Sequence, residues 1–309
     1  MSTSSAAAGS DSAATDSAGP ELAVDGMPRG QAVLDDLVRL LDLEQLEVNL
    51  FRGVSPPQSP TRVFGGQVAG QALVAAGRTV PEDREVHSLH AYFIRPGDPR
   101  VPIVYEAERV RDGRSFTTRR VLAIQHGEAI FSLSASFQLP QDGLDHSQPG
   151  PVDVPDPLTL PDLGERVVAG SGAGWMSQIP RPLDIRFVDE PVWSAARTDA
   201  TEQPVRVWMR ADGRLGDDKL LHVCLLTYAS DLHLLGSVLA RHDKRDVQMA
   251  SLDHAMWFHR PFRADEWVLY TCFSPTASGS RGLATGRFTT ADGTHIATTV
   301  QEGLVRVPR

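Results

Sequence analysis

The chain contains very little lysine and lacks any long apolar run. Lys219 and Lys244 are the only lysines among its 309 residues, so arginine carries almost all of the positive charge. Asp and Glu number 39 against 30 for Lys and Arg, which gives a formal net charge of −9. This charge argues against a nucleic-acid partner, because phosphates require clustered basic residues. No segment approaches the roughly 18 apolar residues that a membrane-spanning helix needs.

Cysteine and targeting signals are also scarce. Cys224 and Cys272 are the only cysteines, and two isolated cysteines favour a reducing compartment over a disulfide framework. The sequence has no metal-ligand spacing and no secretory signal at its N-terminus. Its last residues, Arg306 to Arg309, do not match a peroxisomal address. We therefore expect a cytoplasmic location and no metal site.

What the sequence does contain is an internal repeat. Phe93-Ile94-Arg95-Pro96 returns 165 residues later as Phe258-His259-Arg260-Pro261. Two turn dipeptides recur with a shift of 166 residues, Asp112-Gly113 as Ser278-Gly279 and His126-Gly127 as Asp292-Gly293. Three features at a nearly constant offset indicate a duplicated fold unit.

Each copy is predicted to contain a strand, a central helix and then four antiparallel strands. In the first copy, a preceding helix is expected over 31–43, a strand over 46–51, and the central helix between the glycines at 65–66 and Pro81. Its four strands are expected over about 86–94, 102–111, 115–126 and 129–139. The second copy repeats the pattern, with a strand over 205–210, a helix over 219–228 and strands near 250–258, 266–275, 280–290 and 294–306.

One long helix wrapped by a curved antiparallel sheet is the hotdog fold. We therefore predict an α+β double hotdog, with a disordered tail over residues 1–30, a first hotdog repeat over 31–139, a linker over 140–182 and a second repeat over 183–309. The linker is rich in Pro, Gly, Asp and Ser. The two sheets are expected to join into one continuous sheet, which would hide two exposed edges.

Comparison of the copies selects three candidate site residues. A polar side chain present in only one copy is not required by the shared architecture. Asp231 falls opposite Gly66, Ser251 opposite Val86 and Gln301 opposite Ala135. This alignment places Asp231 at the start of the second central helix. A helix cap for the Asp, a strand-edge position for the Ser and a solvated position for the Gln are the structural alternatives.

Other motif-like features of the sequence give weaker support for a functional site. Asp253 and His254 are neighbours on a predicted strand, so their side chains point to opposite faces, and we interpret His254 and His259 as structural. The Gly-x-Ser-x-Gly nucleophile motif is absent. We interpret the Gly66-x-x-x-Gly70 spacing as helix packing within a globular protein.

From about residue 33 to 309 the chain resembles the acyl-CoA thioesterase II family of double-hotdog enzymes. The segments that carry the resemblance are Leu50 to Gly53, Val63 to Val68, Tyr92 to Asp98, Tyr228 to Leu232, Asp253 to Phe262 and Val300 to Gly303. In that family an Asp, a Thr or Ser, and a Gln hold the hydrolytic water, and these places fall on Asp231, Ser251 and Gln301. The copy comparison selects the same three residues.

The resemblance implies hydrolysis of acyl-CoA thioesters to free fatty acid and CoA. No cofactor is implied, because CoA is part of the substrate, and acyl-CoA is the expected partner. It also implies backbone donors for the oxyanion at the start of the central helix, an apolar tunnel for the acyl chain and arginines at its mouth. We expect neither a nucleic-acid partner nor a membrane span, and allow for a homo-oligomer, either a dimer or a tetramer.

Two alternatives stay open. A hotdog enoyl-CoA hydratase would need a basic residue, commonly a His, facing the acyl chain. A noncatalytic acyl-CoA-binding or scaffold protein would be expected to have lost the three polar groups. Thiol release from acyl-CoAs of graded length separates these functions.

Overall fold

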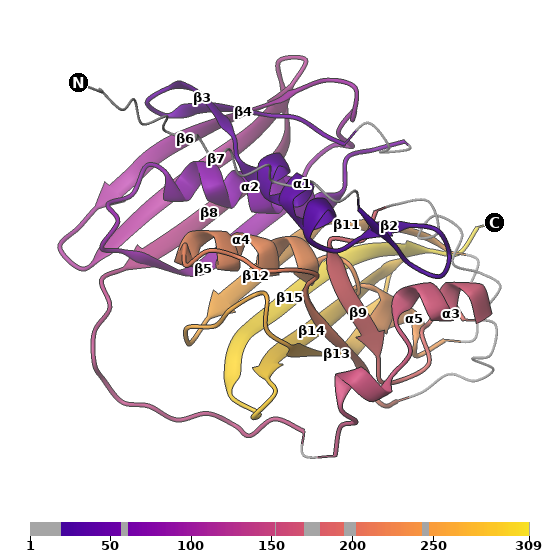
Figure 1. The fold of residues 1–309 in the computed structure, drawn as a ribbon. Helices are drawn as coiled ribbons and strands as arrows, with labels where there is room; N and C mark the ends of the chain where they lie inside the picture. Colours follow the sequence, from indigo (N-terminus) through magenta and orange to yellow (C-terminus); the bar gives the residue numbers. More distant parts are fainter. Residues whose placement is uncertain are drawn as a thin grey trace, which may run out of the picture.

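The two repeats lie side by side and share one large antiparallel sheet (Figure 1). The computed structural model describes residues 20–56, 61–151, 153–169, 180–194, 202–242 and 247–308. Within these residues the main sheet has 13 strands, and the two long helices α2 and α4 lie over it. The predicted α+β double hotdog is therefore confirmed.

The first repeat contains two helices and six strands of the sheet. In chain order they are α1 Gln31–Leu41, β3 Glu44–Glu47, β4 Leu50–Gly53, α2 Gly65–Gly77, β5 Glu85–Phe93, β6 Ile103–Asp112, β7 Phe116–Gln125 and β8 Glu128–Gln138. The strand order is β3-β4-β6-β7-β8-β5. The last four strands agree with their predicted ranges to within one or two residues.

The second repeat follows the linker, of which the structure describes residues 140–151, 153–169 and 180–182. The linker holds η1 Pro157–Thr159 and α3 Leu163–Ala169. The repeat consists of β9 Leu183–Phe187, β10 Val205–Ala211, α4 Lys219–Ser230, α5 Gly236–Leu239, β11 Gln248–Ser251, β12 Asp253–Phe258, β13 Val268–Ser278, β14 Arg281–Thr290 and β15 His295–Arg306. Its strand order is β12-β15-β14-β13-β10-β9, and β11 also pairs with β15.

The two half-sheets meet where β5 pairs with β12. The pairing is antiparallel, with Leu89 opposite Met256 and Ala91 opposite His254. Since each strand satisfies the backbone groups of the other, neither is an exposed edge. The predicted continuous sheet is confirmed, and the end of one repeat is fixed in register against the other.

Helices α2 and α4 run antiparallel and in close contact. A β-carbon at Gly66 would overlap the carbonyl oxygen of Tyr228, and one at Gly70 would lie 3.3 Å from the carbonyl oxygen of Cys224. Near the other end of α2, Gly77 lies against the side chain of Leu220. Glycine therefore permits the close approach of the helices, which confirms the interpretation of the Gly66-x-x-x-Gly70 spacing.

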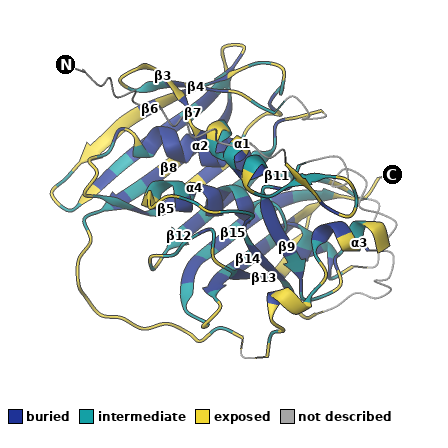
Figure 2. Ribbon diagram, in the orientation of Figure 1, coloured by how far each residue is buried: buried dark blue, intermediate teal, exposed yellow. Residues whose placement is uncertain are grey.

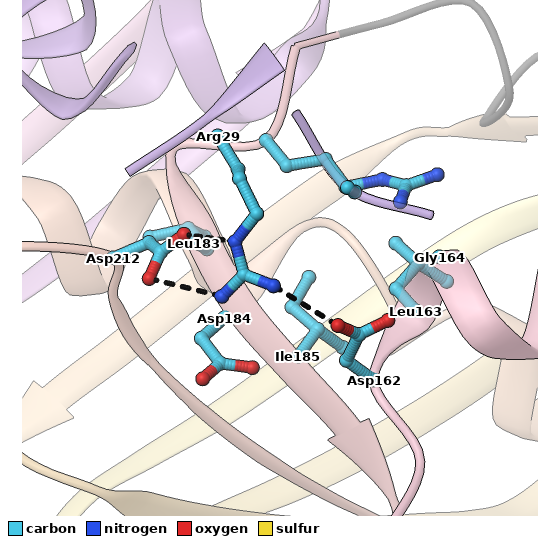
Figure 3. A pocket seen from close by; sticks show the side chains of 10 residues that line it. Arg29, Asp162, Leu163, Gly164, Leu183, Asp184, Ile185 and Asp212 are labelled. Atoms are coloured by element: carbon cyan, nitrogen blue, oxygen red, sulfur yellow. Dashed lines mark hydrogen bonds and ion pairs between the residues drawn. The ribbon is translucent and has the colours of Figure 1, made fainter. Parts of the chain in front are cut away.

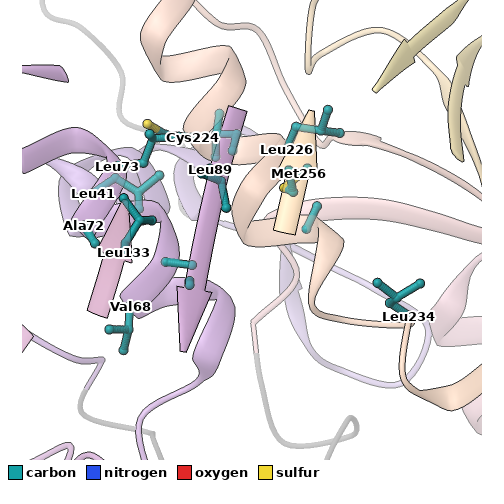
Figure 4. Packing of buried hydrophobic residues seen from close by; sticks show 14 of the residues in the cluster. Leu41, Val68, Ala72, Leu73, Leu89, Leu133, Cys224, Leu226, Leu234 and Met256 are labelled. Atoms are coloured by element: carbon teal, nitrogen blue, oxygen red, sulfur yellow. The ribbon is translucent and has the colours of Figure 1, made fainter. Parts of the chain in front are cut away.

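The core fills the space between these helices and the sheet. Leu73 of α2, Leu89 of β5 and Met256 of β12 are fully buried there (Figure 4), and Figure 2 shows α2 buried along most of its length. Each such side chain stabilises the fold by roughly 1.5–3 kcal/mol relative to an exposed one. Cys224 and Cys272 are free and buried, and burial raises the pKa of both thiols.

The N-terminal segment differs from the prediction of a disordered tail over 1–30. Residues 1–19 lie outside the described residues, but 20–30 form the hairpin of β1 Glu21–Leu22 and β2 Pro28–Arg29. Arg29 donates to Asp212 at 3.0 Å and to Asp162 at 2.9 Å (Figure 3), and Arg181 donates to Asp25 at 2.9 Å. These ion pairs attach residues 20–30 to the rest of the fold. The low apolar content of this segment led to the prediction that it is disordered.

No helix among the described residues is both long enough and apolar enough to span a membrane.

Candidate active site

Asp231, Ser251 and Gln301 meet at one point between the helices and the sheet. Gln301 Nε2 donates hydrogen bonds to Asp231 Oδ1 at 2.7 Å and to Ser251 Oγ at 3.0 Å. Ser251 Oγ donates to the same Asp231 oxygen at 3.3 Å. These three distances lie within hydrogen-bond range. The amide and the hydroxyl thus both donate to one oxygen of the Asp231 carboxylate.

Two of the three residues are placed by strand register. Ser251 ends β11 and lies opposite Gly303 of β15. Gln301 precedes Gly303 by two residues, and residues two apart on a strand project from the same face. The first repeat has the same geometry, with Val86 opposite Phe137. The strand part of the copy comparison, Ser251 with Val86 and Gln301 with Ala135, therefore holds in the structure.

Asp231 does not begin a helix, so its predicted position was wrong. It is the C-terminal cap of α4, and its backbone N–H donates to the carbonyl of Ala229. The constant sequence shift fails here because residues 231–247, which include α5, connect α4 to the sheet, whereas 78–84 make the equivalent connection after α2. The true counterpart of Asp231 is Arg78, which caps the C-terminus of α2.

The carboxylate nevertheless lies at a helix start, namely that of α2 in the other repeat. It accepts a hydrogen bond from the backbone N–H of Gly66, and a β-carbon at Gly65 would lie 2.6 Å from Asp231 Oδ2. The first amides of a helix and its dipole favour negative charge. Both repeats therefore contribute to the site, and the absence of a side chain at Gly65 leaves room for the carboxylate.

The environment of Asp231 shifts its protonation. Burial raises the pKa of Asp231 to about 6, whereas the hydrogen bonds from Gln301, Ser251 and Gly66 and the charge of Arg62 lower it. A carboxylate with this pKa is ionised at neutral pH and is a stronger base than an exposed Asp. These are the properties of a general base.

Both halves of the chain match models of known families. Residues 54–138 match the acyl-CoA thioesterase N-terminal domain, and residues 184–304 match acyl-CoA thioesterase. Mouse acyl-coenzyme A thioesterase 8 is 45% identical over 286 residues, which cover 87% of this chain and 88% of that protein. The chain belongs to the acyl-CoA thioesterase II family.

Two bacterial proteins extend this similarity. Acyl-CoA thioesterase 2 of Haemophilus influenzae is 39% identical over 288 residues, which cover 89% of this chain and 98% of that protein. The crystal structure of the acyl-CoA thioesterase II TesB2 of Mycobacterium marinum superposes with a TM-score of 0.73 at 46% identity, covering 88% of this chain and 98% of that one. The chain is thus an acyl-CoA thioesterase, an enzyme that hydrolyses thioesters.

Sequence reasoning missed the role of Gly65 and Gly66 in this thioesterase. It treated the pair as the counterpart of Asp231, whereas the structure makes them its contacts. Adjacent glycines at a helix start are the available signal, because they permit close approach of another group. The apparent Asp253–His254 dyad is absent, since Asp253 accepts from the backbone of Glu302 and His254 bonds Ser230.

The described cavities lie elsewhere on the thioesterase. A small one borders the Arg29 ion pairs (Figure 3). A larger one of about 600 Å³ is lined by residues including Leu239, Arg241, Arg281 and Val305. Neither is lined by Asp231, so the apolar tunnel and its arginine mouth stay predictions. No group of three His, Cys, Asp or Glu residues suited to a metal ion occurs in the described part of the chain.

Proposed function

We propose that the thioesterase converts acyl-CoA to free fatty acid and CoA with a water held by Asp231, Ser251 and Gln301. The observation that carries this proposal is the mutual hydrogen bonding of the three side chains at 2.7, 3.0 and 3.3 Å. Family membership gives the reaction class, and this geometry supports the proposed assignment of the three residues.

In the proposed reaction Asp231 is the general base. Its carboxylate accepts a hydrogen bond from the water and takes a proton as the water oxygen attacks the thioester carbonyl. Ser251 and Gln301 orient the same water, which lowers the entropic part of the barrier. The pKa of about 6 keeps Asp231 ionised at neutral pH.

The attack produces a tetrahedral intermediate with a negatively charged oxygen. The proposal assigns this oxyanion to backbone amides in the first turn of α2, where the helix dipole also favours negative charge. The carbon–sulfur bond then breaks, and the CoA thiolate takes the proton from Asp231. Water is the nucleophile and CoA leaves from the substrate, so the proposed reaction needs no cofactor.

Thiol release from acyl-CoAs of graded chain length tests the proposal. The purified protein should release one thiol and one fatty acid per substrate, with and without a metal chelator. Product analysis separates the alternatives. Hydrated acyl-CoA without thiol release would indicate a hotdog hydratase, and binding without any product would indicate an acyl-CoA-binding or scaffold protein. Loss of turnover on chelation would contradict the proposed metal-free chemistry.

Cytoplasmic location and homo-oligomeric assembly belong to the same proposal. The free, buried thiols of Cys224 and Cys272 are compatible with a reducing compartment. Light scattering of the purified chain tests for a dimer or tetramer, and cell fractionation tests the location.

A further inference from the structure

Two buried polar atoms beside the catalytic triangle lack a hydrogen-bond partner among the described residues. They are Nδ1 of His254 and Oε1 of Gln301. The two side chains are only 1% and 0% exposed. A buried acceptor without a donor costs about 1–3 kcal/mol, so both atoms call for a donor that the described part of the chain does not provide.

The two side chains are neighbours across the sheet. Strands β12 and β15 pair with Ala255 opposite Val300 and Met256 opposite Thr299. The next opposed positions in this register are His254 and Gln301. Both side chains project toward the helices, since Gln301 reaches Asp231 and His254 reaches Ser230. Opposed side chains in an antiparallel pair begin roughly 5 Å apart at their β-carbons.

The hydrogen bonds of Ser230 favour one tautomer of His254, because the carbonyl of Thr227 at 2.8 Å is a better acceptor for its hydroxyl than Met256 Sδ at 3.4 Å. The Ser230 hydroxyl donates its single hydrogen to the carbonyl of Thr227 at 2.8 Å. It therefore accepts from His254 Nε2–H, which lies 2.8 Å away. Burial lowers the pKa of His254 to about 4, so the ring is neutral. Its Nδ1 is then an acceptor, like Gln301 Oε1, and two acceptors cannot bond each other.

The first repeat shows that this pair is not required by the fold. At the equivalent place in β5 and β8, Leu89 lies opposite Ala135. The second repeat has a polar residue at both positions, as it also does at Ser251. His254, interpreted as structural from the sequence, thus belongs to the set of positions that differ between the two repeats.

We propose that a buried water donates hydrogen bonds to both His254 Nδ1 and Gln301 Oε1, and that His254 is a positioning residue for Gln301. Resting on the proposed function, this inference explains why the Gln301 amide nitrogen faces Asp231 and Ser251. A reversed amide would place its oxygen 2.7 Å from Asp231 Oδ1, which is also an acceptor. The water and His254 favour the same orientation of the Gln301 amide, because they place a hydrogen-bond donor beside its oxygen.

Three variants of His254 separate positioning from a merely structural role. Asparagine places an amide oxygen close to the position of Nδ1 but does not reach Ser230. Glutamine reaches Ser230 but has no acceptor at the Nδ1 position, and leucine is the residue of the first repeat. His254→Asn should keep kcat within about threefold, whereas His254→Gln and His254→Leu should lower kcat about tenfold or more with KM nearly unchanged.

The opposite ranking, with the Gln variant active and the Asn variant impaired, would overturn the inference. So would equal kcat values for all three variants, or a loss beyond a hundredfold in His254→Asn, which would indicate proton transfer by the ring. Melting temperatures verify that each variant is folded. If the wild type releases no thiol, the proposed function fails instead, so the two failures are distinguishable.

A spectroscopic readout is independent of turnover. Nitrogen-15 NMR of the histidine rings should show His254 as the neutral Nε2–H tautomer, assigned through the signal missing in His254→Asn. This state should not titrate between pH 5 and 8. An Nδ1–H tautomer would overturn the inference, because Nδ1 would then be a donor.

Discussion

The two ends of the helix pair α2 and α4 are related by the repeat but differ in chemistry. At one end the C-terminus of α4 meets the N-terminus of α2, and Asp231 lies against Gly65 and Gly66. At the other end the C-terminus of α2 meets the N-terminus of α4, with Arg78 as the cap that corresponds to Asp231. The fold thus offers two equivalent places for a site.

At the second of these places, between the C-terminus of α2 and the N-terminus of α4, the side chains leave no comparable site. Arg78 turns away to donate to the carbonyl of Leu43 at 2.5 Å, and the Leu220 side chain occupies the space beside Gly77. The strands supply Val86 and Ala135, which cannot hold a water. Duplication created two sites in principle, and a few residue exchanges leave the full polar set at one of them.

Replacing Asp231 should have the largest effect. Asp231→Asn removes the proposed general base but keeps the side-chain size, so kcat should fall about a hundredfold or more. Arg78→Ala alters the equivalent cap at the other end and should change kcat by less than about threefold. Steady-state thiol release measures both variants. A larger loss in Arg78→Ala would move the site to the other end of the helix pair.

A methyl group at the helix start should have the next largest effect. In Gly65→Ala the new β-carbon would lie 2.6 Å from Asp231 Oδ2 and 2.7 Å from Phe93 Cε1. The carboxylate must therefore shift, and kcat should fall roughly tenfold. Gly77→Ala is the matched control at the other end of α2, because the atoms nearest to its β-carbon belong to the side chain of Leu220 and not to Asp231. Equal kcat values in the two variants would show that this close approach has no catalytic role.

The pKa of Asp231 predicts a pH profile. Activity requires the ionised carboxylate, so kcat/KM should decline about tenfold per pH unit below about pH 6. The folded-state pKa lies above the ordinary value of 3.8 for an Asp, so the native state binds more protons between about pH 4 and 6. This group's contribution to stability is therefore present at low pH and lost as pH rises through that window.

Asp231→Asn isolates this contribution, since the amide does not titrate. The unfolding free energy of the wild type relative to the variant should decrease from about pH 4 to 6, as measured by urea unfolding. A relative stability that stays flat over this range, together with a kcat/KM that stays flat from pH 5 to 7, would show that Asp231 has an ordinary pKa.

Truncation at the N-terminus should have the smallest effect. Deleting residues 1–19 should leave melting temperature and kcat/KM nearly unchanged. Deleting residues 1–30 also removes the ion pairs of Asp25 and Arg29 with Arg181, Asp162 and Asp212, so the melting temperature should fall by several degrees. Thermal unfolding of both truncations measures the difference, and identical melting temperatures would show that the β1–β2 hairpin contributes no stability.

The sequence was sufficient for the long strands of each repeat and for selecting the three candidate residues, but the strand expected over 46–51 is two strands, β3 and β4, and β9 was not predicted. The repeated Phe-x-Arg-Pro segments and turn dipeptides gave the strands and their correspondence, because strand register tolerates few insertions. Ser251 and Gln301 followed from that register. Val86 and Ala135 occupy the same register positions in the strands of the first repeat as Ser251 and Gln301 occupy in the second.

The helices could not be aligned in the same way. The segment after α4 is longer than the one after α2, so a constant shift matched Asp231 with the start of a helix rather than with Arg78. The ion pairs of Arg29 join segments far apart in the sequence, which composition does not reveal. His254 was interpreted as structural because Asp253, its neighbour on the strand, points to the opposite face; the comparison with Leu89 of the first repeat was not made.

The most direct test of the account is a single turnover in water enriched in oxygen-18, with enzyme in excess over acyl-CoA. Direct attack by the water that Asp231 activates predicts one heavy oxygen in the first fatty acid released. It also predicts no acyl adduct on the rapidly quenched enzyme. Unlabelled fatty acid in the first turnover, or an acyl group on the peptide containing Asp231, would show that the carboxylate attacks the thioester itself and would contradict the account.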